Sequence, residues 1–125
     1  MTLGRGAAAA WTVRIAGLAA VVLGIVTWIG GGKGLVPLHM LVGVILVAGL
    51  WVLAALGLRA GTGPVLPAVA FAWGLLVVLF GLNQATILPG DTHLVVEVAH
   101  LLVGIVAIGI GEAFGTRTGR ARATA

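Results

Sequence analysis

Hydrophobic residues form four long runs in this chain, and three short polar or glycine-rich breaks separate them. The runs cover about residues 11–29, 37–58, 65–82 and 93–114. As an α-helix, each run is long enough to cross about 30 Å of hydrocarbon at about 1.5 Å per residue. Short connections place consecutive helices side by side and antiparallel. The pattern therefore predicts an all-α, up-down-up-down four-helix bundle, with residues 1–125 forming a single membrane domain.

The composition supports an integral membrane protein. Hydrophobic residues make up 61% of the chain and charged residues 8%, whereas soluble domains carry about 25% charged residues. The mean hydropathy is +1.24. The net charge of +4 does not predict nucleic-acid binding, because the basic residues are few and lie at the ends of the apolar segments. Without cysteine, the chain can form neither disulfides nor thiolate metal sites. The lipid bilayer is thus the main predicted partner.

Basic residues are distributed unequally between the two ends of the predicted bundle. One end has Lys33 alone, and the other has six arginines: Arg5, Arg14, Arg59, Arg117, Arg120 and Arg122. The positive-inside rule places the arginine-rich end in the cytoplasm. We therefore expect a protein of the cell (inner) membrane with both termini cytoplasmic. Residues 115–125 should form a basic, unstructured cytoplasmic tail, and the histidines should lie in the outer half of the bundle.

The fourth apolar segment contains an unusual group of ionisable residues. His93, Glu97 and His100 are spaced i, i+4 and i+7, so a helix projects all three from one face. Ionisable groups in a membrane helix are costly, and each needs a partner or a wet cavity. This face is therefore the first candidate for a functional site.

The motif His-x-x-x-Gly occurs twice, at His39 to Gly43 in the second segment and at His100 to Gly104 in the fourth. The two histidines lie at similar depths, so they are predicted to face each other across the bundle. The repeat favours two related helical hairpins. Chance similarity between apolar segments remains the alternative.

This pair predicts a haem b site with His39 and His100 as the two axial ligands. Imidazoles from two helices can approach an iron from opposite faces, and bundle cores accommodate such cofactors. Gly43 and Gly104 lie one turn deeper on the same faces, where the missing side chains would let a flat porphyrin approach the helices. The alternative is that the glycines simply allow close helix packing and that each histidine bonds a carbonyl or water.

A small metal site is a second interpretation. Imidazole and carboxylate ligands suit zinc, copper or iron ions. His93 and His100 lie about 10.5 Å apart along a helix, too far for one ion to bridge comfortably. Glu97 with one histidine of its own helix, and His39 from the second segment, is the easier ligand set. Glu97 has three further interpretations: a proton relay, an acceptor that orients His100, or a hydrogen-bond partner of the segment-end amides Asn83 and Gln84.

With histidines on its second and fourth helices and a Glu-x-x-His run at Glu97 to His100, the chain resembles one four-helix half of the haem A synthase family. More loosely, it resembles small membrane cytochromes b. The resemblance implies a four-helix bundle with a haem between its two histidines. In that family the Glu-x-x-His run lies on the second helix and there are two halves, so the resemblance implies haem binding here but not the enzymatic reaction.

Two functional hypotheses follow. The first is a haem b protein for electron transfer or haem handling, with a quinone or another redox membrane subunit as its partner. The second is an accessory or interaction subunit, or a small transporter with a His/Glu pocket for a metal or solute. Either is compatible with a homo-oligomer. The sequence contains no recognisable catalytic nucleophile or phosphate-binding loop, so an enzyme is the less favoured class.

The predicted orientation can be tested with reporter fusions. A reporter at the C-terminus that works only in the cytoplasm should be active, because the arginines stay on that side. Activity of a reporter that works only in the periplasm would instead show the opposite topology.

Overall fold

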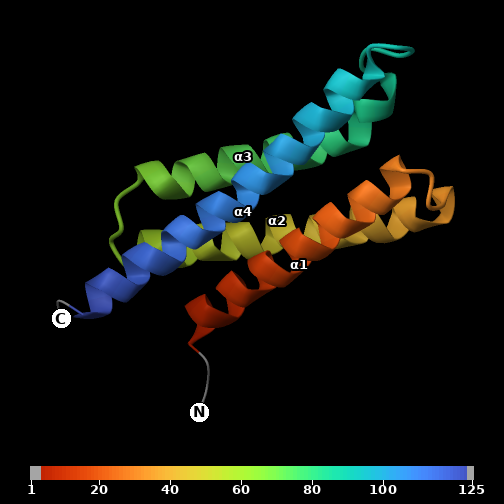
Figure 1. Ribbon diagram of the computed structural model, residues 1–125. Helices are drawn as coiled ribbons and strands as arrows, with labels where there is room; N and C mark the ends of the chain where they lie inside the picture. The colour runs from red at the N-terminus through yellow and green to blue at the C-terminus, as the bar shows by residue number, and fades with distance from the viewer. Residues whose placement is uncertain (1–3, 124–125) are drawn as a thin grey trace.

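The computed structural model describes the backbone of residues 4–123 and the side chains as far as Arg117. Its four long helices form an up-down bundle, which confirms the predicted fold class (Figure 1). They are α1 (Arg5–Trp28), α2 (Val36–Arg59), α3 (Val65–Asn83) and α4 (His93–Ala123). Two short 3-10 helices, η1 (Lys33–Leu35) and η2 (Gln84–Thr86), precede α2 and follow α3. By length and composition, all four long helices can cross a membrane.

The observed helices differ from the predicted segments at two ends. Helix α1 begins at Arg5 instead of near residue 11. Residues 115–123, predicted to be an unstructured tail, continue α4 to Ala123. Both additions are rich in alanine or arginine and contain no proline, and each of their glycines, Gly6, Gly115 and Gly119, disfavours a helix by only about 1 kcal/mol. Pro37 lies in the first turn of α2, where its missing N–H costs no hydrogen bond.

The start of α1, the end of α4 and the 60–64 turn between α2 and α3 lie together at one end, which we call the terminal end (Figure 1). Segments 29–35 and 84–92 lie at the other end, which we call the histidine end. The core fills the terminal half and the middle of the bundle. Its buried side chains are Ala9, Val13, Ala16, Leu46, Val47, Leu50, Leu53, Ala54, Ala70, Val77, Ala107 and Phe114.

Glycines allow the helices to approach closely in this core. A methyl group on Gly111 of α4 would lie 2.6 Å from Cγ1 of Val13 on α1. One on Gly57 of α2 would lie 2.7 Å from the ring of Phe114 on α4. Hydrocarbon side chains gain little by leaving lipid for protein, so membrane helices associate through such close packing.

An ion pair joins the first and last helices near the terminal end. Arg14 donates through Nε to Oε1 of Glu112 and, at 2.8 Å, through Nη2 to Oε2. The guanidinium also lies 5.0 Å from the centre of the Trp11 ring. The two charges are therefore paired with each other inside the apolar segments.

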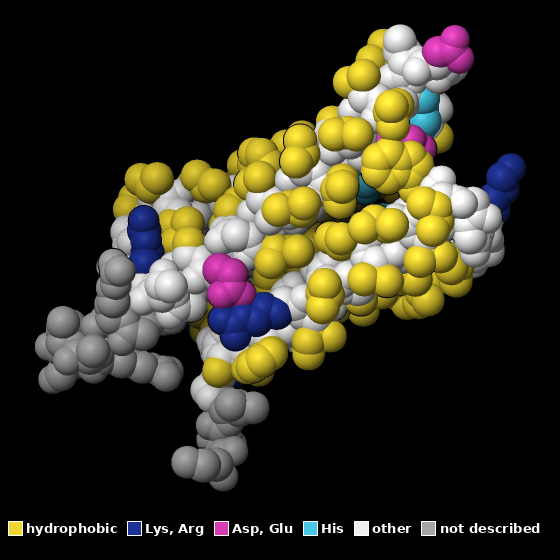
Figure 2. Space-filling view, in the orientation of Figure 1, with side chains coloured by type: hydrophobic (Ala, Val, Ile, Leu, Met, Phe, Trp, Pro, Cys, Tyr) yellow, Lys and Arg dark blue, Asp and Glu magenta, His cyan; other side chains and the backbone are white. Residues whose placement is uncertain are grey.

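Towards the histidine end, the hairpin α1–α2 diverges from the hairpin α3–α4 (Figure 1). The surface is hollowed between them, and a histidine side chain is visible at the bottom of the hollow (Figure 2). The fold thus packs tightly at one end and encloses a cavity at the other.

The packing predicts opposite effects for two neighbouring glycine substitutions in α4. Gly111→Ala should lower the melting temperature in detergent, because its methyl group collides with Val13. Gly109→Ala should be neutral or stabilising, since nothing lies within 4 Å of the added methyl group and alanine favours a helix by up to about 1 kcal/mol. Equal melting temperatures for the two variants would contradict the packing of α1 on α4.

Candidate cofactor site

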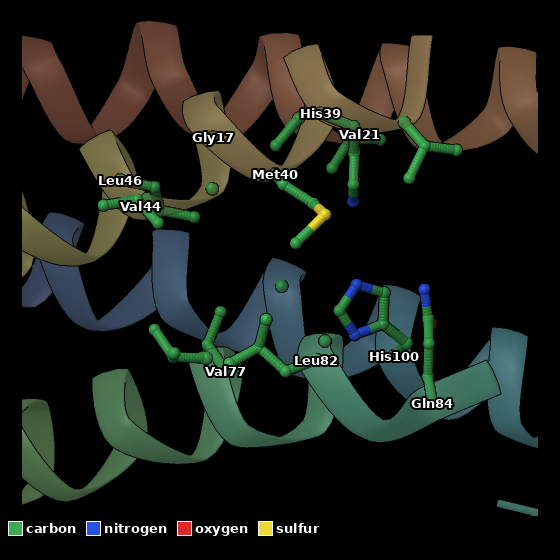
Figure 3. Close-up of a pocket in the computed structure, with 16 residues that line it drawn as sticks. Gly17, Val21, His39, Met40, Val44, Leu46, Val77, Leu82, Gln84 and His100 are labelled. Atoms are coloured by element: carbon green, nitrogen blue, oxygen red, sulfur yellow. The ribbon is translucent and has the colours of Figure 1, made fainter. Parts of the chain in front are cut away.

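The structure brings His39 of α2 and His100 of α4 together at the histidine end. Their ring centroids lie 6.0 Å apart, with the ring planes at 65°. Figure 3 shows the two imidazoles pointing towards each other from opposite sides of the cavity. The His-x-x-x-Gly repeat therefore identified two residues that the fold places in direct opposition.

Each histidine rests on a glycine of the preceding helix. A methyl group on Gly24 of α1 would lie 3.2 Å from Cε1 of His39, and one on Gly81 of α3 would lie 3.3 Å from Cε1 of His100. The same glycine–histidine contact thus occurs in both hairpins. This agreement in space supports the interpretation of the chain as two related hairpins. On the α3 side, the Phe80 ring also contacts His100 edge to face at 5.6 Å between centroids.

Nδ1 of both imidazoles is buried and has no hydrogen-bond partner. A buried polar atom without a partner costs free energy, and in native proteins such atoms are few. The described fold contains no other buried side-chain nitrogen or oxygen in this condition. His39 and His100 also line the same cavity, so the fold gathers two imidazoles with unpaired nitrogens in one place.

A cavity of about 150 Å³ adjoins the histidines, and all four helices line it. Gly43 and Gly104 belong to its wall, and nothing lies within 4 Å of where their Cβ atoms would be. Gly57 and Gly111 differ, because neighbouring side chains occupy the space beside them. The glycine of each His-x-x-x-Gly motif therefore faces open space.

Sequence reasoning missed two residues of this cavity. Met40 follows His39 directly, and its thioether extends from α2 into the cavity (Figure 3). Gln84 lines the cavity from η2 and lies beside His100 in the same view, although it looked like an ordinary helix-end residue. The only sequence signal for Gln84 is that its polar amide directly follows the third apolar segment.

His93 and Glu97 lie outside the cavity wall. Nδ1 of His93 lies 3.3 Å from the carbonyl oxygen of Ile87 in the preceding loop. Glu97 does not orient His100 through Nδ1, because that atom has no partner. Asn83 donates to the carbonyl of Leu79 and is not the partner of Glu97.

The three-ligand ion site also lacks support. Among the residues that the structure describes, no three His, Cys, Asp or Glu side chains lie close enough to hold a metal ion. The ligand set of His39, Glu97 and a histidine of α4 is therefore not assembled. Of the predicted metal ligands, only His39 and His100 line the cavity.

In comparisons with known protein families, with curated proteins and with solved structures, the chain matches none of them. The resemblance to one half of the haem A synthase family therefore stays a prediction that rests on the histidines and the Glu-x-x-His run. The features that bear on its function are four long apolar helices and one pair of imidazoles beside a cavity.

Proposed function

We propose that this protein is a membrane haem b protein in which His39 and His100 are the axial ligands of one iron. The observation that carries the proposal is the opposed imidazole pair with both Nδ1 atoms buried and unpaired. The chain has three histidines, and the third lies against a loop carbonyl. Only one bis-histidine site is therefore possible.

The spacing of the pair suits a shared iron. A metal atom about 2 Å from each ligating nitrogen places the two ring centroids roughly 6 Å apart, because each centroid lies about 1 Å behind its nitrogen. The observed separation is 6.0 Å. The imidazoles could thus ligate the metal without a large movement of α2 or α4.

The open space above Gly43 and Gly104 suits a flat ring system that lies against both helices. The cavity has the volume that accommodates a molecule of about the size of benzene, so it holds part of a porphyrin and not the whole of it. The rest would extend out of the cavity between the diverging hairpins. The polar wall, with Gln84 and the histidines, lies at the histidine end, and the deeper wall of Gly17, Leu46 and Val77 is apolar. Propionates would therefore point towards the membrane surface.

When bound, the haem supplies one-electron chemistry, and the chain holds it in place and excludes water from its deeper edge. A single site at one end of the bundle cannot by itself pass electrons across about 30 Å of hydrocarbon. The protein therefore needs a quinone or another redox subunit as its partner, or it handles haem without net electron transfer.

A bare copper(I) ion is the second candidate, and Met40 favours it. A thioether beside two imidazoles gives one sulfur and two nitrogen donors around the cavity (Figure 3). Soft sulfur ligands select copper(I), and a single ion needs no more space than the cavity offers.

Absorption spectra of the purified protein test the haem proposal. After expression with a haem precursor, the dithionite-reduced protein should show the sharp α and β bands of six-coordinate haem, with about one haem per chain. His39→Ala and His100→Ala should each abolish this spectrum. His93→Ala is the matched control, because it removes the remaining histidine, and it should retain the haem.

Filling the cavity should also prevent haem binding, although both histidines remain in place. Gly104→Leu places a side chain where the ring would lie, so haem content should fall while the melting temperature of the haem-free protein is maintained. Gly109→Leu, also on α4 but away from the cavity, should keep its haem. A colourless wild-type protein would contradict the proposal, and copper that is lost in Met40→Leu would favour the second candidate.

Glu97→Gln tests whether Glu97 takes part in holding the cofactor. Because Glu97 does not line the cavity, the variant should bind as much haem as the wild type and melt at a similar temperature. Measured haem per chain and thermal melting decide the point. Loss of all bound haem from a folded Glu97→Gln variant would place this carboxylate among the groups that hold the cofactor.

A further inference from the structure

The cavity is not closed on the side between α2 and α3. Several of its wall residues are also exposed on the molecular surface: Met40 is 44% exposed, Val44 55% and Leu82 59%. Met40 and Val44 lie one turn apart on α2, and Leu82 lies on α3 near its end. On α1, the wall residues Gly17 and Ala20 are buried and Val21 is half-buried.

The opening follows from the topology. Helices α2 and α3 are joined by the short 60–64 turn at the terminal end, where they lie close, and they diverge towards the histidine end (Figure 1). Figure 3 shows Met40 in the gap between α2 and α3 at that end. Because no loop within residues 4–123 crosses this gap, only side chains separate the cavity from the surroundings of the bundle.

Apart from Asn83 and Gln84, which follow Leu82 at the end of α3, the surroundings of the opening are apolar. Besides Met40, Val44 and Leu82, the neighbouring exposed side chains are Leu41, Ile45 and Leu79. All of them lie within segments apolar enough to span a membrane. A window framed by such side chains faces lipid, whereas a passage for a ligand from water would require polar groups along its rim.

We propose that the cofactor reaches the histidines sideways from the bilayer, through the opening between α2 and α3, with Met40 and Leu82 as the residues it must pass. This inference rests on the proposed haem function and adds the route by which the ligand arrives. Methionine is unbranched and flexible, so it can move aside and then cover the exposed edge of the ring. Haem is planar, largely apolar and soluble in membranes, which matches a narrow apolar window.

The absence of cysteine allows a direct measurement of what the opening faces. Met40→Cys, labelled with a nitroxide and reconstituted in lipid, should be more accessible to oxygen, which partitions into the bilayer, than to a water-soluble nickel complex. Leu41→Cys is the matched control, since Leu41 is 57% exposed but is not part of the cavity wall. Haem should reduce the oxygen accessibility at position 40 and leave that at position 41 unchanged.

Uptake rates provide the second test. Apoprotein in lipid vesicles is mixed with vesicles that contain haemin, and the growth of the Soret band is followed. Met40→Trp and Leu82→Trp should slow uptake by about ten-fold or more, because a bulky ring adds to the barrier for passage. Val52→Trp and Leu76→Trp place the same ring at exposed positions of the same helices, outside the cavity wall and its rim, and should take up haem at the wild-type rate. Met40→Ala, which widens the opening, should accelerate uptake.

The outcomes separate the two proposals. Wild-type protein that shows the lipid-facing opening but no Soret band would overturn the haem function, and the route for haem with it. Haem binding with equal uptake rates in all four tryptophan variants would overturn the route and leave the function intact. Greater accessibility of position 40 to the nickel complex than to oxygen would show a path from water and would also overturn the route.

Discussion

Close packing around small residues holds this bundle together, and the rest of the structure depends on where that packing is possible. In a bilayer, apolar side chains gain little by moving from lipid to protein, so helices associate where their surfaces fit closely. Gly111 against Val13 and Gly57 against Phe114 provide such fits at the terminal end. The Arg14–Glu112 ion pair adds a directional bond between α1 and α4 at the same end.

At the histidine end, the close glycine contacts lie within each hairpin, Gly24 with His39 and Gly81 with His100, and the cavity lies between the hairpins. Gly43 and Gly104 face empty space, although they are the same residue type as the glycines that pack the core. A hydrogen bond from Trp73 Nε1 on α3 to the carbonyl of Val103 on α4, at 2.9 Å, joins the second hairpin just below the site. Tight packing therefore ends near the depth of Gly104, and the space above it is available to a ligand.

The buried core lies mainly in one half of the bundle, and the candidate site lies in the other half. Neither the core cluster nor the ion pair includes a histidine. The two imidazoles can then keep unpaired buried nitrogens, a cost that the packed half has to offset. Residues at the site can thus be changed with limited effect on the fold, which makes the ligand set open to mutagenesis.

The sequence by itself determined the fold class, because four apolar runs of membrane-spanning length allow few arrangements when the connections are short. It also identified His39 and His100, since histidine is rare in this chain and the His-x-x-x-Gly motif repeats at matched depth. The tertiary structure decided which ionisable residues join them. His93 and Glu97 share a helix face with His100 in sequence, but that face is broad, and the cavity wall includes only His100. Met40 and Gln84 enter the site because helix rotation and the divergence of the hairpins bring them there, and neither quantity can be read from the hydrophobic pattern of a single helix.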